Sequence, residues 1–300
     1  MDISCMLGLK NKIKESVKYR FWYSYYNLLR QIKCLQRPNI KWKPLERCLP
    51  RFVSIVHEAD VPLLAYSLNS LMRQVDKRPN FWLVGDSDAA HGKLQSWLSA
   101  SSPTDVEFWH WETLLSKLDS RYQTFIQTWL NSGKWGGYAK KFAITLAANA
   151  DSDILLFDAD VLWFGDFPSI LQSLRQKNPT ILAGQDYQQS YDLEVIEFLG
   201  DRSILAGAPL NCGLVYYSQG ILPQTIPAEK LMNLLPYAKQ ATTHLEQTII
   251  AHAFWQANGE WFDSDTLATT MIDNFKLRRQ TESLARHYAG GKHLFWRDAY

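Results

Sequence analysis

The chain has 300 residues, of which 46% are hydrophobic, and it carries a formal net charge of +2. This length and apolar content allow a sizeable buried core, which excludes an intrinsically disordered protein. The charge is uneven, because residues 1–51 hold 12 Lys and Arg against 3 Asp and Glu, whereas the rest hold 20 against 27. We therefore expect a basic N-terminal segment followed by an acidic main domain, with the boundary near residue 50.

Cysteine spacing and hydropathy bear on where the protein works. The four cysteines, at 5, 34, 48 and 212, lack the close pairing of a zinc site and the density of a small disulfide scaffold. The longest apolar runs fall short of the roughly 20 residues of a spanning helix, and the N-terminus lacks the pattern of a secretory signal. The expectation is a reduced, cytoplasmic protein without a membrane span.

Residues 1–50 are predicted to form a basic, aromatic-rich helical extension. Residues 8–36 have the pattern of one or two helices, and Pro38, Pro44 and Pro50 then interrupt regular structure. Aromatic residues interleaved with Lys and Arg suit a helix lying on anionic lipid at the inner face of a membrane. They include Tyr19, Phe21, Trp22, Tyr23, Tyr25 and Tyr26. A solvated basic surface stays open as the alternative, and no nucleic-acid motif accompanies these charges.

From residue 51 onward, strand and helix patterns alternate. Apolar runs predict strands at 52–57, 80–85, 106–109 and 154–157, with helices at 61–74, 91–99, 111–118, 120–131 and 138–148. Further strands at 180–184 and 213–217 and helices at 228–235 and 244–257 follow. Strand–helix–strand repeats imply right-handed parallel crossovers. Residues 51–300 are thus predicted to be an α/β domain with a mostly parallel, Rossmann-like central sheet flanked by helices.

Two carboxylates directly follow the strand predicted at 154–157. In an extended chain, residues i and i+2 point the same way, so Asp158 and Asp160 can reach one ion. Oxygen ligands suit Mg²⁺ or Mn²⁺, which also bind diphosphate oxygens. Carboxylates held this close repel each other unless a cation lies between them. We predict a divalent metal site here, with a strand-end cap as the structural alternative.

The apolar strand that runs into Asp158-Ala-Asp160 resembles the DxD motif of GT-A glycosyltransferases. Three later segments are similar to glycosyltransferase family 8 and its relatives. The first, Pro209-Leu-Asn-Cys-Gly-Leu-Val-Tyr216, is similar to the family's Asn-x-Gly segment before a strand. The resemblance implies that Asn211 contacts the donor or acceptor sugar and that Gly213 belongs to the same site. A plain turn before a strand is the alternative.

The other two segments lie near the C-terminus. Glu246 and Gln247 are similar to the family's Asp-Gln pair, which starts a helix beside the acceptor site. The segment from His287 to Trp296 resembles His-x-x-Gly-x-x-Lys-Pro-Trp, whose His is the third metal ligand and whose Lys meets a donor phosphate. His287 and Gly290 fit this pattern, whereas Lys292 comes one residue early and no proline follows it.

Further candidates follow from position. Gln185 and Asp186 end the strand predicted at 180–184, where they would face the sugar, and a carboxylate there can stabilise developing positive charge. Lys140 and Lys141 lie on the helix before the metal strand, and one of them is expected to face the nucleotide. The ends of parallel strands meet at the ligand site. The donor is therefore also expected near four strand-end residues: His57, Glu58, Asp86 and Ala159.

The resemblance implies a metal-dependent hexosyltransferase with the GT-A fold. Such an enzyme moves a sugar from a nucleotide-diphosphate sugar, with UDP-sugars favoured, to a hydroxyl of a saccharide or glycolipid, and retains the anomeric configuration. Mn²⁺ or Mg²⁺ would neutralise the leaving diphosphate, assisted by Lys292 or Arg286. An inverting enzyme would need a general base, for which Glu246 or Asp186 could serve.

Three alternative functions stay open. The Asp pair also resembles the nucleophile motif of haloacid-dehalogenase-type phosphatases, but that motif normally opens its domain, and here about 100 residues of alternating strands and helices precede it. A nucleotidyltransferase usually carries a glycine-rich basic loop after its first strand, and Glu58-Ala-Asp-Val-Pro62 is neither. A non-catalytic carbohydrate-binding protein would use the many aromatic residues as a saccharide platform.

Overall fold

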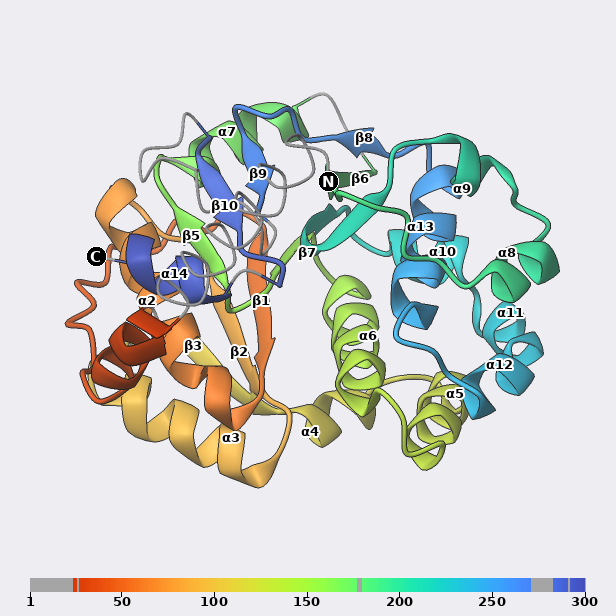
Figure 1. The fold of residues 1–300 in the computed structure, drawn as a ribbon, viewed down its shortest axis with the longest axis horizontal. Helices are drawn as coiled ribbons and strands as arrows, with labels where there is room; N and C mark the ends of the chain where they lie inside the picture. Colours follow the sequence, from red (N-terminus) through yellow and green to blue (C-terminus); the bar gives the residue numbers. More distant parts are fainter. Residues whose placement is uncertain (1–23, 26, 177–179, 271–282, 291, 300) are drawn as a thin grey trace, which may run out of the picture.

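The computed structural model describes residues 24–25, 27–176, 180–270, 283–290 and 292–299. A seven-stranded sheet with the order β3-β2-β1-β4-β7-β6-β8 forms the centre, and helices lie on both of its faces (Figure 1). Its strands are β1 (Arg51–Val56), β2 (Phe81–Gly85), β3 (Val106–His110), β4 (Ile154–Phe157), β6 (Ile181–Gln185), β7 (Leu210–Tyr217) and β8 (Glu260–Trp261).

The first four strands of the sheet run parallel to one another, in the order β3-β2-β1-β4. Strand β7 is antiparallel to both β4 and β6, and β8 is parallel to β6. The predicted α/β class with a mostly parallel sheet is confirmed. The strand order reverses between β1 and β4, and such a switch point opens a crevice at the carboxyl ends of the strands.

The helices include every one predicted from residue 61 onward and five that were not predicted, at 167–175, 193–199, 203–206, 221–225 and 292–298. They are α2 (Val61–Gln74), α3 (Asp88–Leu94), α4 (Trp111–Leu115), α5 (Ser120–Asn131), α6 (Gly136–Asn149), α7 (Phe167–Arg175), α8 (Leu193–Leu199), α9 (Ser203–Ala206), α10 (Ile221–Thr225), α11 (Ala228–Asn233), α12 (Leu235–Lys239), α13 (Leu245–Gln256) and α14 (Lys292–Asp298). A 3₁₀ turn, η1 (Glu58–Asp60), precedes α2, and a π-helical turn, η2 (Gln95–Ser99), follows α3.

Among the predicted boundaries that are wrong, three have a clear physical reason. The helix expected at 91–99 begins at Asp88, because the Ser87 hydroxyl accepts the Ala90 N–H as an N-cap. The helix expected at 228–235 is two helices, α11 and α12, since Pro236 lacks the N–H that would continue the first. Strand β7 begins at Leu210, before the predicted 213, because it pairs with β6 from that residue onward.

Apolar side chains alternate between two buried clusters, one on each face of the sheet. Phe52 and Leu155 pack with α2, α7 and α14, whereas the adjacent Val53 and Leu156 pack with α5, α6 and α13. Burying each such side chain contributes about 1.5–3 kcal/mol. Strands covered on both faces are continuously apolar, which is why β4 appears in the sequence as an uninterrupted run.

A second sheet of three short strands was not predicted. Its strands are β5 (Val161–Trp163), β9 (Leu267–Thr269) and β10 (Ala285–His287), in the order β5-β10-β9. It packs on the α2 side of the central sheet, where Trp163 belongs to the same buried cluster as Phe52. Because β5 follows the Asp pair directly, this sheet fixes what lies beside the two carboxylates.

The described part of the N-terminal extension packs on the main domain. Residues 24–25 and 27–34 are helical, so the helix expected at 8–36 ends two residues early, and residues 35–36 form a turn and a bend. Residues 8–23 and 26 of the expected helix lie outside the described residues, including Tyr19, Phe21, Trp22, Tyr23 and Tyr26. Ile40 is buried, and the ring of Trp42 packs edge-on against Phe81. Lys33 Nζ donates hydrogen bonds to main-chain carbonyls of α14 and its C-terminal end. The boundary at residue 50 stays a prediction.

None of the helices in the described ranges combines the length and the apolar character that crossing a membrane requires.

Candidate metal centre and ligand cleft

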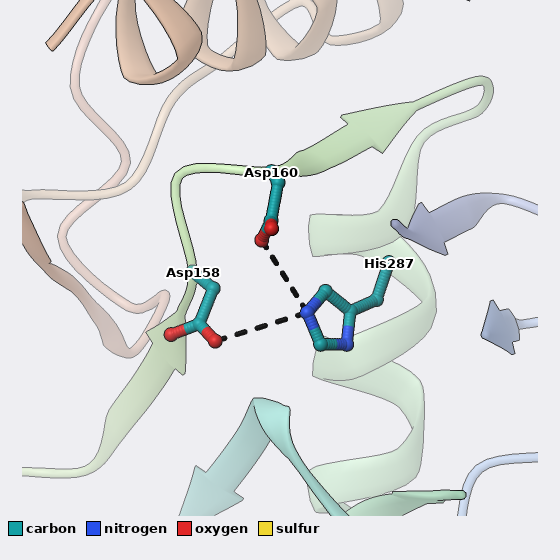
Figure 2. Close-up of side chains that lie close together, drawn as sticks. All are labelled: Asp158, Asp160 and His287. Carbon is teal, nitrogen blue, oxygen red and sulfur yellow. Dashed lines mark ion pairs between the residues drawn. The ribbon is translucent and has the colours of Figure 1, made fainter. Parts of the chain in front are cut away.

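Three side chains from two distant parts of the chain converge at the carboxyl end of β4 (Figure 2). Potential ligand atoms of Asp158, Asp160 and His287 all lie within 4.8 Å of one another. His287 Nε2 is 3.7 Å from an Asp158 carboxylate oxygen and 3.3 Å from one of Asp160. Two carboxylate oxygens and one imidazole nitrogen form a donor set that suits a divalent cation. The predicted trio of metal ligands is therefore brought together.

The small sheet places His287 beside the acid pair. Strand β10 runs antiparallel to β5, so that His287 lies opposite Val161, the residue after Asp160. The Tyr288 N–H donates to the Asp160 carbonyl at 3.0 Å and continues this pairing. The pairing of β10 with β5 therefore holds His287 beside residues that precede it by more than 120 positions in the sequence.

Hydrogen bonding sets the tautomer of His287. The Gly213 N–H donates to Asn211 Oδ1 at 2.8 Å, which fixes that oxygen as an acceptor. His287 Nδ1 lies 2.8 Å from the same oxygen and must be the donor. In the neutral ring the lone pair is then on Nε2, which faces the two aspartates (Figure 2). Asn211, expected at a sugar, therefore supports the metal ligand from behind.

Gly213 makes room for that histidine. A Cβ atom at position 213 would lie 2.0 Å from His287 Cε1, far inside van der Waals contact. The pairing between β6 and β7 also shifts register here, so that Ala183 pairs with Val215 but Gly184 pairs with Asn211. Such irregularities redirect side chains next to active sites. The Asn-x-Gly segment thus shapes the centre through backbone and packing.

Lys141 is the buried cation of the centre. Its ammonium lies 2.7 Å from Asp158, donates to the Cys212 carbonyl at 3.0 Å and is 3.9 Å from Glu246. Burial lowers the pKa of Lys141, but the charges of Asp158 and Glu246 outweigh it and raise the pKa. Lys141 therefore stays protonated and orients one oxygen of Asp158, which leaves the other oxygen toward His287.

Burial has the opposite consequence for Glu246, which is 3% exposed on the first turn of α13. Desolvation raises its pKa to about 7, against the opposing attraction of Lys141. A carboxyl group with a pKa near neutrality can hold or release a proton during a reaction. Glu246 is therefore chemically distinct from Asp158 and Asp160, the candidate metal-binding carboxylates next to it.

Metal affinity is expected to fall as the pH is lowered. Burial alone would lower the pKa of His287, but its hydrogen bond and attraction to Asp160, together with Asp158, raise it. Nε2 must lose that proton before it can bind a cation, so Mn²⁺ should bind about tenfold more weakly for each pH unit below this pKa. Isothermal titration calorimetry across the neutral range measures the effect. A wild-type affinity as flat with pH as that of His287→Gln would contradict it.

The centre lies where two cavities of one cleft meet, since both are lined by Tyr138, Lys141, Asp158, Asp160 and Lys292. The first, of ≈ 350 Å³, runs along the strand ends, where its other lining residues include Val56, His57, Asp60, Asp86, Trp135 and Ala159. The second, of ≈ 490 Å³, extends toward α13, where its lining includes Asp186, Asn211, Gly213, Glu246, Gln247, His287 and Gly290. A ligand that occupies both cavities can therefore contact the centre where they meet.

Most predicted site residues line this cleft, and four do not. Lys140 Nζ instead donates to the Asp86 carbonyl at 2.6 Å, so that Lys141 is the lysine in the cleft. Glu58 is exposed beside Lys93 at 3.9 Å. Gln185 alternates with Asp186 and is exposed at the end of β6. Arg286, which neighbours His287 on β10, points to Asp298 at 3.8 Å.

The structure adds lining residues that the sequence patterns missed, among them Asp60, Trp135 and Tyr138. Asp60 binds Lys292 with a 2.9 Å ion pair, and Lys292 Nζ also lies 3.9 Å from Asp160. Trp135, half exposed and with a positive φ of 56°, precedes α6, and Tyr138 follows on its first turn. The Gly136-Gly137 pair is the sequence feature that could have identified Trp135 as a lining residue. It marks a turn before a helix, and the side chains of such a turn lie at the ends of the strands.

Comparison with solved structures finds glycosyltransferases. Mouse xyloside xylosyltransferase 1, in its apo form, matches with a TM-score of 0.54 and 13% identity over 80% of this chain and 97% of its own. The apo bifunctional glycosyltransferase WbbM matches with 0.51 and 14%, over 85% of this chain and 47% of its own. Apo GlyE of Streptococcus pneumoniae TIGR4 matches with a TM-score of 0.50 and 14% identity, over 84% of this chain and 60% of its own.

No protein-family model matches the sequence, and no curated protein matches it. At identities of 13–14% the structural matches establish the fold alone. The chain therefore has the GT-A fold of known glycosyltransferases.

Proposed function

We propose that the protein is a metal-dependent glycosyltransferase that moves a hexosyl group from a nucleotide-diphosphate sugar, with a UDP-sugar favoured, to a hydroxyl of a saccharide or glycolipid. The observation that carries this proposal is the group formed by Asp158, Asp160 and His287, whose ligand atoms lie within 4.8 Å of one another inside the cleft of a GT-A fold. The resemblance of the same three residues to family 8 adds retention of the anomeric configuration.

The charge of the cleft supports a position for the donor in the first cavity. Asp60, Asp86, Asp158 and Asp160 line the first cavity against two cations, Lys141 and Lys292, so a diphosphate needs a further cation beside it. Asp158, Asp160 and His287 would hold Mn²⁺ or Mg²⁺, which supplies charge neutralisation for the leaving diphosphate. Lys292 is released for the phosphate if its ion pair with Asp60 opens. The nucleoside then occupies the strand-end cavity near His57 and Asp86.

The lining of the cavity beside α13 supports a position for the acceptor there. Gln247 Nε2 donates to the Leu210 carbonyl and lies 3.4 Å from Asp186, and this contact holds the amide and the carboxylate together at the cavity wall. Asp186 would stabilise positive charge that develops at the sugar, and Gln247 would orient it. Glu246, with its pKa of about 7, is the group suited to move a proton at the acceptor hydroxyl.

A donor panel tests the proposed function. UDP-, GDP-, CDP- and dTDP-sugars are incubated with the protein in Mn²⁺ and in a chelator, and donor hydrolysis and thermal stability are measured. We expect one nucleotide class to stabilise the protein only with metal, since a ligand at 100 times its dissociation constant adds about 2.7 kcal/mol. Release of pyrophosphate from a nucleoside triphosphate and a sugar 1-phosphate, offered separately, would instead favour a nucleotidyltransferase, and hydrolysis of a simple phosphate monoester would favour a phosphatase. No stabilisation by any nucleotide would overturn the proposal.

We further propose that the cytoplasmic enzyme contacts an anionic membrane through its N-terminal extension. Leu28 and Ile32 on the described helix and Leu35 in the turn that follows it recur at helical spacing, with exposed fractions of 54%, 46% and 86%. The segment around them carries the excess of positive charge. Apolar residues on one face with basic residues nearby favour anionic lipid.

Vesicle binding tests this contact. The protein is expected to co-sediment with vesicles of phosphatidylcholine and phosphatidylglycerol, but not with phosphatidylcholine alone, and less in high salt. Leu28→Gln with Leu35→Gln should weaken binding about tenfold or more, because each buried side chain loses its transfer free energy. Phe198→Gln, which removes an exposed aromatic side chain on α8, is the matched control. Equal binding of all variants would count against the membrane contact.

A further inference from the structure

A third cavity, of ≈ 270 Å³, lies at the far end of α2 from the metal centre. Its lining combines three cations with two amides and a methionine: Asn39, Lys41, Lys43, Asn69, Met72 and Arg73. No acidic side chain belongs to this lining. At about 1.5 Å per residue, the 13 residues from Asp60 to Arg73 span roughly 20 Å, so this cavity is distinct from the ligand cleft.

Two rigid elements build the cavity. Residues 39–43 alternate, with Ile40 buried in the core and Trp42 packed edge-on against Phe81, while the three residues between and around them line the cavity. Alternation along an extended segment puts those three on one side. On α2, Asn69, Met72 and Arg73 follow the i, i+3, i+4 spacing of one helix face. The cations are therefore held together by a segment anchored in the core.

The cavity lining carries positive charge that no acidic lining residue balances. Asn69 is 6% exposed and lines the cavity, where its amide group can donate a hydrogen bond to a ligand. In the described part of the chain, Lys41 and Lys43 form no ion pair. Two like charges that line one small cavity favour an anion between them.

We propose that this cavity is a second binding site, specific for a phosphate-bearing group. Two ammonium groups and a guanidinium group supply the charge, and the Asn69 amide supplies a directional donor to a phosphate oxygen. The site is independent of sugar transfer at the metal centre, and its ligand is either a free phosphate or the phosphate of a lipid head group. The second source would bring the exposed Leu35, four residues before Asn39, to the same surface.

Calorimetric titration with inorganic phosphate and pyrophosphate tests the free source. Lys41→Gln and Lys43→Gln should each weaken binding about tenfold, and Asn69→Asp, which replaces a donor by a negative charge at equal size, should remove it. Lys41 is exposed, so its variant is expected to fold even if the change at the buried Asn69 is disruptive. Lys239→Gln, an exposed charge removed from α12, should bind as the wild type does.

Vesicles of phosphatidylcholine with and without phosphatidic acid test the lipid source. If phosphate in solution does not bind but phosphatidic acid does, and if Lys43→Gln and Asn69→Asp weaken that binding while Lys239→Gln does not, the ligand is a lipid head group. Phosphate binding in solution that the same variants weaken supports a free phosphate. Failure of both probes to bind, or binding that the cavity variants leave unchanged, would overturn the proposal. Donor binding at the metal centre should be unaffected by all of these variants.

Discussion

Asp160→Asn is expected to abolish metal-dependent transfer while leaving the protein folded. Asp160 is 6% exposed and lies 3.3 Å from His287 Nε2. Because the position is buried, there is little room for another ligand to take the place of its carboxylate. The amide keeps the size of the side chain but loses the charge that holds a divalent cation. Since even outer-sphere changes cost metal sites about 10–100-fold, loss of this ligand should cost at least 100-fold in metal-dependent activity. Donor hydrolysis in Mn²⁺ measures the loss of activity, and thermal melting followed by circular dichroism shows whether the variant is folded.

Asp76→Asn provides a matched control, because Asp76 is an exposed carboxylate that follows α2 and does not line the cleft. It should leave activity and melting unchanged. Asp158→Asn should behave like Asp160→Asn, with an added loss of stability because Lys141 would keep a buried charge with a weaker partner. Normal activity in either variant of the acid pair would show that the pair does not hold the metal.

Gly213→Ala is expected to disable the centre without changing any polar group. The added Cβ would lie 2.0 Å from His287 Cε1, so the imidazole ring must move. The ring is held on its other side by Asn211, and its displacement withdraws Nε2 from the aspartates. Mn²⁺ affinity should fall about 10–100-fold, and the free energy of unfolding should fall by about 1–3 kcal/mol from the overpacking. Calorimetry and chemical denaturation measure the two quantities.

Gly92→Ala, on α3, is the comparison variant, since a Cβ there meets no atom within 4 Å. Alanine in a helix should leave Mn²⁺ binding unchanged and stabilise the fold slightly, by about 0.5–1 kcal/mol. If Gly213→Ala binds Mn²⁺ as tightly as Gly92→Ala does, the close packing between Gly213 and His287 is not what positions the metal ligand.

The parts of this fold that sequence patterns predicted are those whose signals are local. Helix α5 begins where expected because the Asp119 side chain accepts the Arg121 N–H, and α2 begins with Pro62 in its first turn. Strand β4 is a continuous apolar run because both of its faces are buried. The Asp pair follows that strand directly, so its position at the edge of the sheet could be derived from spacing alone.

What could not be derived depends on contacts between distant segments. Strands β5, β9 and β10 have three residues each, too few for a period-2 pattern to be seen. His287 was reached only through a short motif resemblance, because its register opposite Val161 is a tertiary fact. Spacing also could not separate Lys140 from Lys141, since adjacent residues on a helix point about 100° apart and only the packing of α6 shows which faces the cleft.

The central claim is that Asp158, Asp160 and His287 together hold a divalent cation beside a nucleotide diphosphate. Crystals grown with Mn²⁺ and UDP, measured for the anomalous scattering of manganese, test it most directly. The account predicts one strong peak within about 2.0–2.6 Å of both carboxylates and of His287 Nε2, with the diphosphate on its open side. A nucleotide bound in the cleft with no manganese at these three side chains, or manganese bound only elsewhere, would contradict it.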